Sequence, residues 1–187
     1  MPEERTGEAF EDEEQLTVIG LQLQVGEKAP PFQLTLSHSP LKEVTPVLSS
    51  YFRGRVVLLS FVNALSTSVC RDQTRFLEDH TQALPLRESG AIIITVSMEP
   101  SIYLAGWRDG AALSLQQLLS AEHNPKLLEA YGVSIKEWPN MPQRAVFVIG
   151  GDGNLVLVRY IADQGSQEEA DSAVMDAVEA VNKLLKA

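Results

Sequence analysis

The sequence predicts an α/β fold in which helices flank a mixed β-sheet, and two features carry this prediction. Residues 56–59 (VVLL) and 91–96 (AIIITV) are apolar without alternation, as expected of central strands that are covered on both faces. A helical segment follows each run, which implies parallel pairing. Residues 150–153 (GGDG) then join two further strand-like segments as a hairpin, which implies antiparallel neighbours.

The segments before the first central strand are mostly extended. Residues 1–14 hold seven acidic residues and one arginine, which predicts a flexible acidic tail. Residues 15–23 (QLTVIGLQL) predict a short hairpin or bent strand around Gly20. Further elements are expected as a strand at Phe32–Leu36, a turn at His38–Pro40 and one helical turn at Val47–Phe52.

The later segments alternate between helices and strands. The helix after the first central strand should run to about Leu84, because Pro85 ends it. Residues 115–120 (LQQLLS) fit either a short strand or a helical turn. The other expected elements are helices from Pro100 to about Arg108 and at Pro125–Tyr131, strands at 144–149 and 154–161, and a closing helix that starts with the capping box of Ser166 and Glu169. This order is the thioredoxin-like arrangement, in a single domain over residues 15–187.

Composition and charge exclude several classes of function. The net charge is −10 and no basic stripe is present, which argues against nucleic-acid binding. The acidic start lacks the apolar segment of a secretory signal, and no run of 18 apolar residues suggests a membrane span, so we expect a cytoplasmic protein. The three histidines have no metal-site spacing, no C-x-x-C occurs, and the glycines at 150–153 open no helix. We therefore expect no metal and no cofactor, while a Cys–His hydrolase stays open without a recognisable signature.

The only cysteine of the chain, Cys70, lies where a helix should begin after the first central strand. Thr67 suits the N-cap position, so Cys70 would occupy the third position of the helix, in a Thr-x-x-Cys pattern with the spacing of a capping box. A helix N-terminus offers unpaired N–H groups and a partial positive charge, which favour the reactive thiolate. The alternative is that Cys70 is a small buried apolar residue.

Three segments carry a resemblance to a known family. They are residues 17–32 (TVIGLQLQVGEKAPPF), 51–70 (YFRGRVVLLSFVNALSTSVC) and 131–156 (YGVSIKEWPNMPQRAVFVIGGDGNLV). In order and spacing they resemble the thiol peroxidase branch of the peroxiredoxins, over most of residues 15–187. The first segment is similar to the N-terminal β-hairpin extension that marks this branch.

The resemblance implies a peroxidase and assigns roles to three residues. Cys70 matches the peroxidatic cysteine, which attacks the O–O bond of a hydroperoxide and becomes a sulfenic acid. Thr67 matches the threonine whose hydroxyl would hold the thiolate and the peroxide oxygen. Arg144 matches the arginine that would stabilise the thiolate and the charge on the leaving oxygen. The structural alternatives are a simple helix cap for Thr67 and a surface charge at a strand end for Arg144.

The chain departs from the family pattern at three positions. Asn63 and Ser68 stand where the family motif has prolines, and Trp107 is the nearest match to the resolving cysteine. A single cysteine implies that an external thiol, from a thioredoxin-like protein or a low-molecular-weight thiol, reduces the sulfenic acid. The family also implies a homodimer near the active-site loops. The rival prediction is a degenerate peroxiredoxin fold that binds a partner or senses oxidants without efficient turnover.

Overall fold

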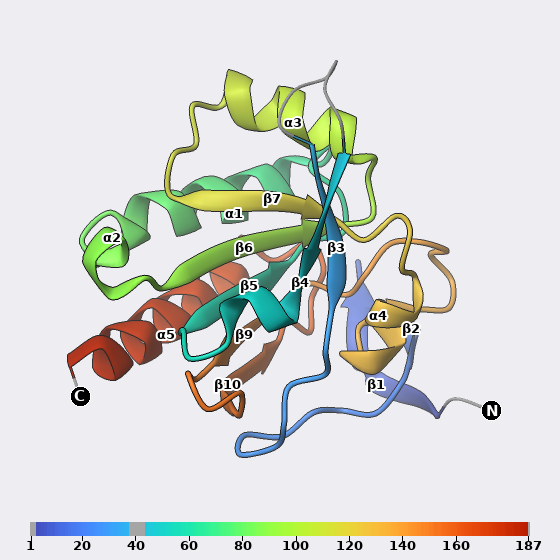
Figure 1. Ribbon diagram of the computed structural model, residues 1–187. Coiled ribbons are helices and arrows are strands. Elements are labelled where there is room, and N and C mark those ends of the chain that lie inside the picture. Colours follow the sequence, from blue (N-terminus) through green and yellow to red (C-terminus); the bar gives the residue numbers. More distant parts are fainter. Residues whose placement is uncertain (1–2, 38–43, 187) are drawn as a thin grey trace.

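The computed structural model describes residues 3–37 and 44–186 and contains the predicted mixed sheet flanked by helices (Figure 1). The central sheet has seven strands in the order β10-β9-β5-β6-β7-β3-β4, and a smaller sheet has the order β1-β2-β8. The pairs β5/β6 and β6/β7 are parallel, and the other pairs of the central sheet are antiparallel. The strands are β1 (Glu4–Glu11), β2 (Glu14–Ile19), β3 (Gln33–Ser37), β4 (Val44–Leu48), β5 (Val57–Phe61), β6 (Ile92–Ser97), β7 (Gln116–Ser120), β8 (Ser134–Ile135), β9 (Ala145–Ile149) and β10 (Leu155–Tyr160).

The helices cover both faces of the central sheet. They are η1 (Ser49–Phe52), α1 (Ser68–Thr81), α2 (Leu86–Ser89), α3 (Ser101–Gly110), α4 (Lys126–Ala130) and α5 (Gln167–Lys186). Successive residues of a strand face opposite sides, so Leu58 packs against α1 and α5 while Leu59 packs in the core that contains α4. No helix of the described residues is both long and apolar enough to cross a membrane.

The described part of the acidic N-terminal segment, residues 3–14, forms strand β1 and the turn into β2, so the predicted flexible tail is wrong for these residues. Its acidic side chains lie mostly outward, whereas Arg5 and Ala9 are buried. Arg5 donates a hydrogen bond to the carbonyl oxygen of Gly132 at 2.7 Å and anchors the strand. Asp12 and Glu13 turn the chain into β2 with positive φ values of 47° and 73°. The prediction of a solvated tail rested on the net charge of the segment. It failed because a charge count ignores which face of a strand the charges occupy.

The predicted N-terminal hairpin is present, but it begins earlier than expected. It pairs β1 with β2, whereas the sequence suggested a bend within residues 15–23. Gly20 has a φ of 109°, and a Cβ there would lie 2.1 Å from the carbonyl oxygen of Glu129. Glycine is therefore required at this position by a close approach of the backbone of α4, which no local pattern reveals.

Other boundaries differ in detail. α1 ends at Thr81 rather than near Leu84, and the chain forms the short α2 after Pro85. Residues 116–120 form strand β7, so the ambiguity of this segment is resolved in favour of a strand. Strand β4 was not predicted. The expected turn at His38–Pro40 lies outside the described residues.

The closing helix begins close to the predicted capping box. The backbone N–H of Glu169 donates to Ser166 Oγ at 3.2 Å, as such a box requires. The carboxylate of Glu169 accepts instead from the N–H groups of Ala162 and Asp163, at 2.9 and 3.1 Å. Half of the box is therefore formed, and its carboxylate holds the loop before α5.

Candidate active site

Cys70 lies at the third position of α1, as the sequence predicted. The chain leaves β5 at the carboxyl end of the central strand, and Thr67 takes extended N-cap dihedrals before Ser68 starts the helix. The Thr67 side chain does not cap the helix, because its hydroxyl donates to the carbonyl oxygen of Ala64 at 2.9 Å. Thr67 is exposed, and its hydroxyl keeps a lone pair that can accept a hydrogen bond.

The Cys70 side chain is completely buried. It packs in an apolar cluster with Val62, Leu65, Leu104 and Leu118. Trp107, which the sequence comparison matched most nearly to the family's resolving cysteine, packs against the same cluster and is partly buried. A substrate can therefore reach the sulfur only after the residues around it move.

Asn63 connects Cys70 to the loop before α5 through hydrogen bonds. Its Nδ2 donates to the carbonyl oxygen of Pro142 at 2.5 Å and to Gln164 Oε1 at 3.2 Å. Both partners are acceptors, since Gln164 Nε2 donates to the carbonyl oxygen of Ile161 at 2.7 Å. The Asn63 oxygen must then face Cys70, whose sulfur lies 3.7 Å away and donates to it.

Arg144 is completely buried, so the alternative of a surface charge at a strand end is wrong. Its Nη1 donates to Gln73 Oε1 at 3.3 Å, and its Nη2 donates to the carbonyl oxygens of Asp163 and Ser166, at 3.2 and 2.8 Å. These partners are neutral acceptors, and its Nε has no partner among the described residues. Burial lowers the pKa of Arg144, and the negative charge of a Cys70 thiolate is the largest of the effects that oppose this shift.

Arg144 is therefore buried within electrostatic range of Cys70, whereas Thr67 lies exposed at the N-terminus of α1. Gln73 on α1 links the helix of Cys70 to the sheet. Its Oε1 accepts from Arg144, which precedes β9, and its Nε2 donates to Ser60 Oγ on β5 at 3.0 Å. Among the described residues no carboxylate bonds directly to Arg144, and Asp163, Glu11 and Glu169 act on it only from a greater distance. A thiolate at Cys70 would further offset the cost of burying this cation. This arrangement can stabilise negative charge on the sulfur.

Sequence reasoning missed two polar residues of this site. Gln73 follows Cys70 by three positions, so it lies on the same helix face, and a glutamine on a buried face was the available signal. Gln164 lies in a loop, and no local pattern marks it. Its Oε1 also accepts from the backbone N–H of Arg144 at 2.9 Å.

Glu99 fixes the loop that precedes α1. Its carboxylate accepts from the N–H groups of Leu65 and Ser66, at 2.6 and 3.3 Å, and from Ser97 Oγ at 3.1 Å. These bonds tie the active-site loop to the segment between β6 and α3. The described residues contain no group of three or more histidine, cysteine, aspartate or glutamate side chains that could hold a metal ion.

Comparison with known proteins identifies the family. Residues 25–158 match the AhpC/TSA family. A thiol peroxidase of Listeria innocua is 30% identical over 88% of this chain and 94% of its own length. A thiol peroxidase of Halalkalibacterium halodurans is 29% identical over 85% of this chain and 90% of its own length.

Solved structures agree with the fold. A peroxiredoxin-like protein from Aquifex aeolicus superposes with a TM-score of 0.74 at 20% identity, covering 92% of this chain and 98% of that chain. A thiol peroxidase from Chromobacterium violaceum gives a TM-score of 0.71 at 17% identity, covering 91% and 97%. The predicted thioredoxin-like fold is thus confirmed, and the chain belongs to the AhpC/TSA family of peroxiredoxins, in its thiol peroxidase branch.

Proposed function

We propose that this protein is a thiol-dependent peroxidase of the cytoplasm that reduces hydrogen peroxide or organic hydroperoxides through Cys70 alone. The observation that carries the proposal is the buried Arg144, which has neutral hydrogen-bond partners and lies within electrostatic range of Cys70. Membership of the peroxiredoxin family supports the same chemistry. A helix N-terminus and a buried guanidinium both stabilise a thiolate at this position.

The proposed oxidation is a two-electron transfer of oxygen. The Cys70 thiolate attacks the terminal oxygen of the hydroperoxide, the S–O bond forms, and the O–O bond breaks. The leaving alkoxide or hydroxide takes a proton and departs as alcohol or water. Arg144 would stabilise the charge that develops on this oxygen, and the Thr67 hydroxyl, once turned from Ala64, would hold the peroxide.

The proposed reduction uses an external thiol, because the chain has no second cysteine. One thiol attacks the sulfenic acid to give a mixed disulfide and water, and a second thiol releases Cys70 and a disulfide. A thioredoxin-like protein or a low-molecular-weight thiol would supply these equivalents. Trp107 then serves only as packing beside Cys70.

We further propose a homodimer with the α3 surface at its interface. Ile102 and Tyr103 on α3 are 51% and 41% exposed. They follow Glu99, whose carboxylate binds the active-site loop, so this apolar surface adjoins the site.

The test is the rate of sulfenic acid formation with hydrogen peroxide and cumene hydroperoxide. We expect oxidation orders of magnitude faster than that of free cysteine, and none in Cys70→Ser. Replacing Arg144 by Ala should slow it by about 100-fold, because a charged donor to the reacting oxygen is lost. Arg144→Lys keeps a positive charge in the interior, so its oxidation rate should fall less than that of Arg144→Ala. This comparison separates the electrostatic effect from a folding defect.

The matched control is Arg159→Ala, which removes an arginine that pairs with Asp176 on the surface of α5. This variant should react like the unaltered protein. Oxidation of the unaltered protein at the rate of free cysteine, without dependence on Arg144, would overturn the peroxidase proposal.

A second candidate is a peroxiredoxin fold that senses oxidants or binds a partner without efficient turnover. Asn63 favours it, because its amide oxygen accepts from Cys70 and so stabilises the neutral thiol. Full burial of the sulfur also slows access. Absorbance of the thiolate near 240 nm separates the candidates: a predominant thiolate at pH 7 supports the peroxidase, and a neutral thiol supports the second candidate.

A further inference from the structure

A pocket of about 650 Å³ lies at the end of the central sheet opposite to Cys70. Val57 and Ile149, which pair at the start of β5 and the end of β9, form its floor. Cys70 follows the other end of β5, and the strand between them spans about 15 Å. The pocket is therefore separate from the candidate active site, and its volume suits a small organic ligand.

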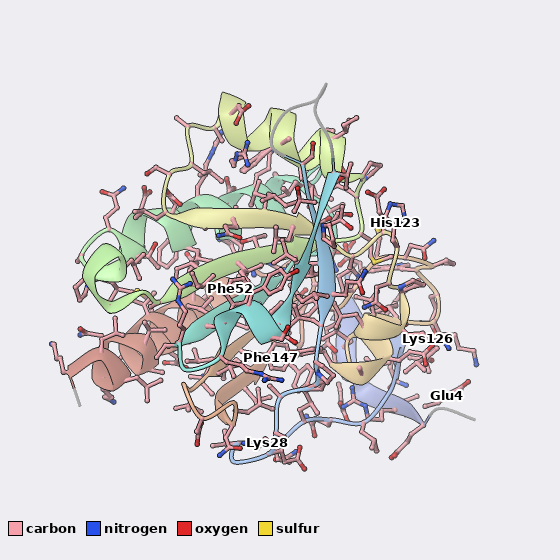
Figure 2. All side chains as sticks on the ribbon, in the orientation of Figure 1. Glu4, Lys28, Phe52, His123, Lys126 and Phe147 are labelled. Atoms are coloured by element: carbon pink, nitrogen blue, oxygen red, sulfur yellow. The ribbon has the colours of Figure 1, made fainter. Side chains whose placement is uncertain are left out.

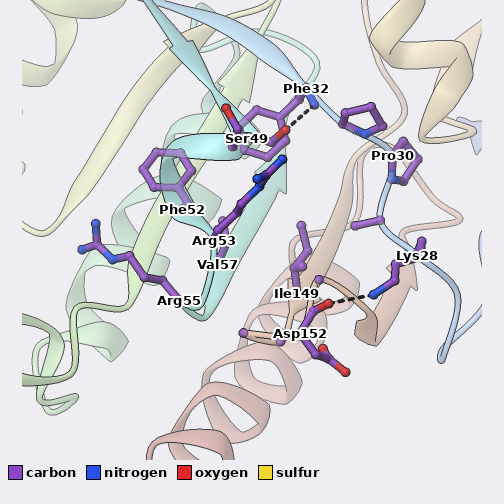
Figure 3. A pocket seen from close by; sticks show the side chains of 16 residues that line it. Lys28, Pro30, Phe32, Ser49, Phe52, Arg53, Arg55, Val57, Ile149 and Asp152 are labelled. Carbon is purple, nitrogen blue, oxygen red and sulfur yellow. Dashed lines mark hydrogen bonds between the residues drawn. The ribbon is translucent and has the colours of Figure 1, made fainter.

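The walls of the pocket are largely apolar. Phe32 and Phe52 have ring centroids 6.2 Å apart on one side, and Pro30 continues this wall (Figure 3). Pro31 also lines the pocket. Ser49 Oγ accepts from the N–H of Phe32 at 3.1 Å, which leaves the hydroxyl hydrogen available for a ligand. These walls fit a flat apolar group with a polar substituent.

Cations outnumber carboxylates around the pocket, although the whole chain has a net charge of −10. The cations are Lys28, Arg53 and Arg55, and the carboxylate is Asp152. Both oxygens of that carboxylate accept from Asn154 within the same turn, at 3.0 and 2.7 Å. The side chains that line the pocket therefore carry three formal positive charges and one negative charge, a balance that favours an anionic ligand.

The three cations differ in their freedom to bind a ligand. Lys28 Nζ donates to the carbonyl oxygen of Asp152 at 2.7 Å, and Arg55 Nε donates to the carbonyl oxygen of Gly90. The side chain of Arg53 is exposed and has no hydrogen bond or ion pair within residues 3–37 and 44–186. In Figure 3 its side chain extends between the walls toward Ser49, whereas Arg55 points away. Arg53 therefore offers an unoccupied guanidinium beside the aromatic wall.

From this juxtaposition we propose that the pocket binds a small aromatic anion, whose ring packs on Phe32 and Phe52 and whose carboxylate or phosphate pairs with Arg53. A guanidinium binds either group through two parallel hydrogen bonds. Lys28 lines the same pocket, and its ammonium keeps donors beyond its bond to the carbonyl oxygen of Asp152. The proposal is independent of the peroxidase proposal, because the pocket does not include Cys70.

The test is calorimetric titration of the purified protein with three probes. 2-Naphthoate carries ring and charge, 2-naphthamide carries the same ring without charge, and inorganic phosphate carries charge alone. We expect one saturable site for 2-naphthoate and at least tenfold weaker binding of the other two. Binding of naphthoate should weaken about tenfold in Arg53→Gln and be lost in Arg53→Glu, because an attractive charge is removed or reversed.

Two variants control for charge and for the cysteine. Lys126→Gln removes an exposed cation on α4, well separated from Lys28 and Phe52 (Figure 2), and should bind naphthoate normally. Cys70→Ser should also bind normally. The proposal would be overturned if 2-naphthamide or phosphate bound as tightly as 2-naphthoate. It would also be overturned if Arg53→Gln bound 2-naphthoate as tightly as the unaltered protein, or if Cys70→Ser lost this binding. A peroxidase rate like that of free cysteine would leave it intact.

Discussion

At the scale of single residues, two neighbours act on the Cys70 sulfur in opposite directions. Arg144 is a buried positive charge and favours the thiolate. Asn63 presents an amide oxygen, which accepts from the thiol and repels a thiolate. The proposed reactivity of Cys70 would therefore depend on the balance between these two residues, and a proline at position 63 could not provide the second effect.

Replacing Asn63 by Ala should increase the thiolate fraction at pH 7 and destabilise the protein. The thiolate gains because Arg144 then acts without the opposing amide oxygen. The free energy of unfolding should fall by about 1–3 kcal/mol, because the carbonyl oxygen of Pro142 loses its donor in the interior. Absorbance at 240 nm and urea unfolding measure the two effects.

Ser68→Ala is the matched control, since it changes the other proline position of the motif at an exposed site. It should alter neither quantity. An unchanged thiolate absorbance in Asn63→Ala would contradict the assigned orientation of the amide.

At the scale of elements, the helix that carries Cys70 also fixes the start of β7. Glu78 on α1 is buried and accepts from the N–H groups of Ser114 and Leu115, at 2.7 and 2.9 Å. Burial acts to raise the pKa of Glu78, but these bonds and those from Gln116 outweigh it and lower the pKa. One carboxylate thus holds the connection between α3 and β7 against the helix of the site.

Glu78→Gln should destabilise the protein in a pH-dependent way. The pKa of Glu78 is lower in the folded chain than its ordinary value of 4.5, so its contribution is complete above that pH and is lost as the pH falls through the folded value. At pH 7 the variant should lose about 1.5–3 kcal/mol of unfolding free energy, because an amide cannot accept all these bonds. The difference should shrink as the pH falls below 4.5, as urea unfolding over this range will measure.

Glu179→Gln provides the comparison for this series. Glu179 is exposed on α5 and pairs with Lys183, so water replaces its interactions easily. Its unfolding should follow the unaltered protein at each pH. A pH-independent deficit in Glu78→Gln would mean that packing, and not charge, explains the loss.

At the scale of the whole molecule, the proposed dimer depends on the exposed apolar residues Ile102 and Tyr103 of α3. Ile102→Glu should convert the dimer to a monomer, because it introduces a charge into an apolar interface. Sedimentation velocity measures the change. Met175→Glu alters a comparably exposed apolar residue on α5, 46% exposed, and should leave the dimer intact. A monomer in the unaltered protein would contradict the proposed assembly.

The sequence predicted elements whose signals are local. The unbroken apolar run at 56–59, the N-cap position of Thr67 and the hairpin signal at 150–153 each lie within a few residues of the structure that they specify. The N-terminal segment was misjudged because its charges were counted without their faces. Gln164 was missed because its partners come from other parts of the chain.

By itself the sequence determined the order of the central strands β5, β6, β9 and β10 and of the helices α1, α3, α4 and α5, and the location of Cys70 in the first turn of a helix. It could do so because apolar periodicity and helix caps act over short distances. Only the tertiary structure decided the environment of the sulfur. Asn63 reaches Pro142 and Gln164 across 79 and 101 residues, and Arg144 reaches Gln73 across 71. The burial of Arg144 follows from the packing of α5 and the loop before it, and no local pattern specifies contacts of this range.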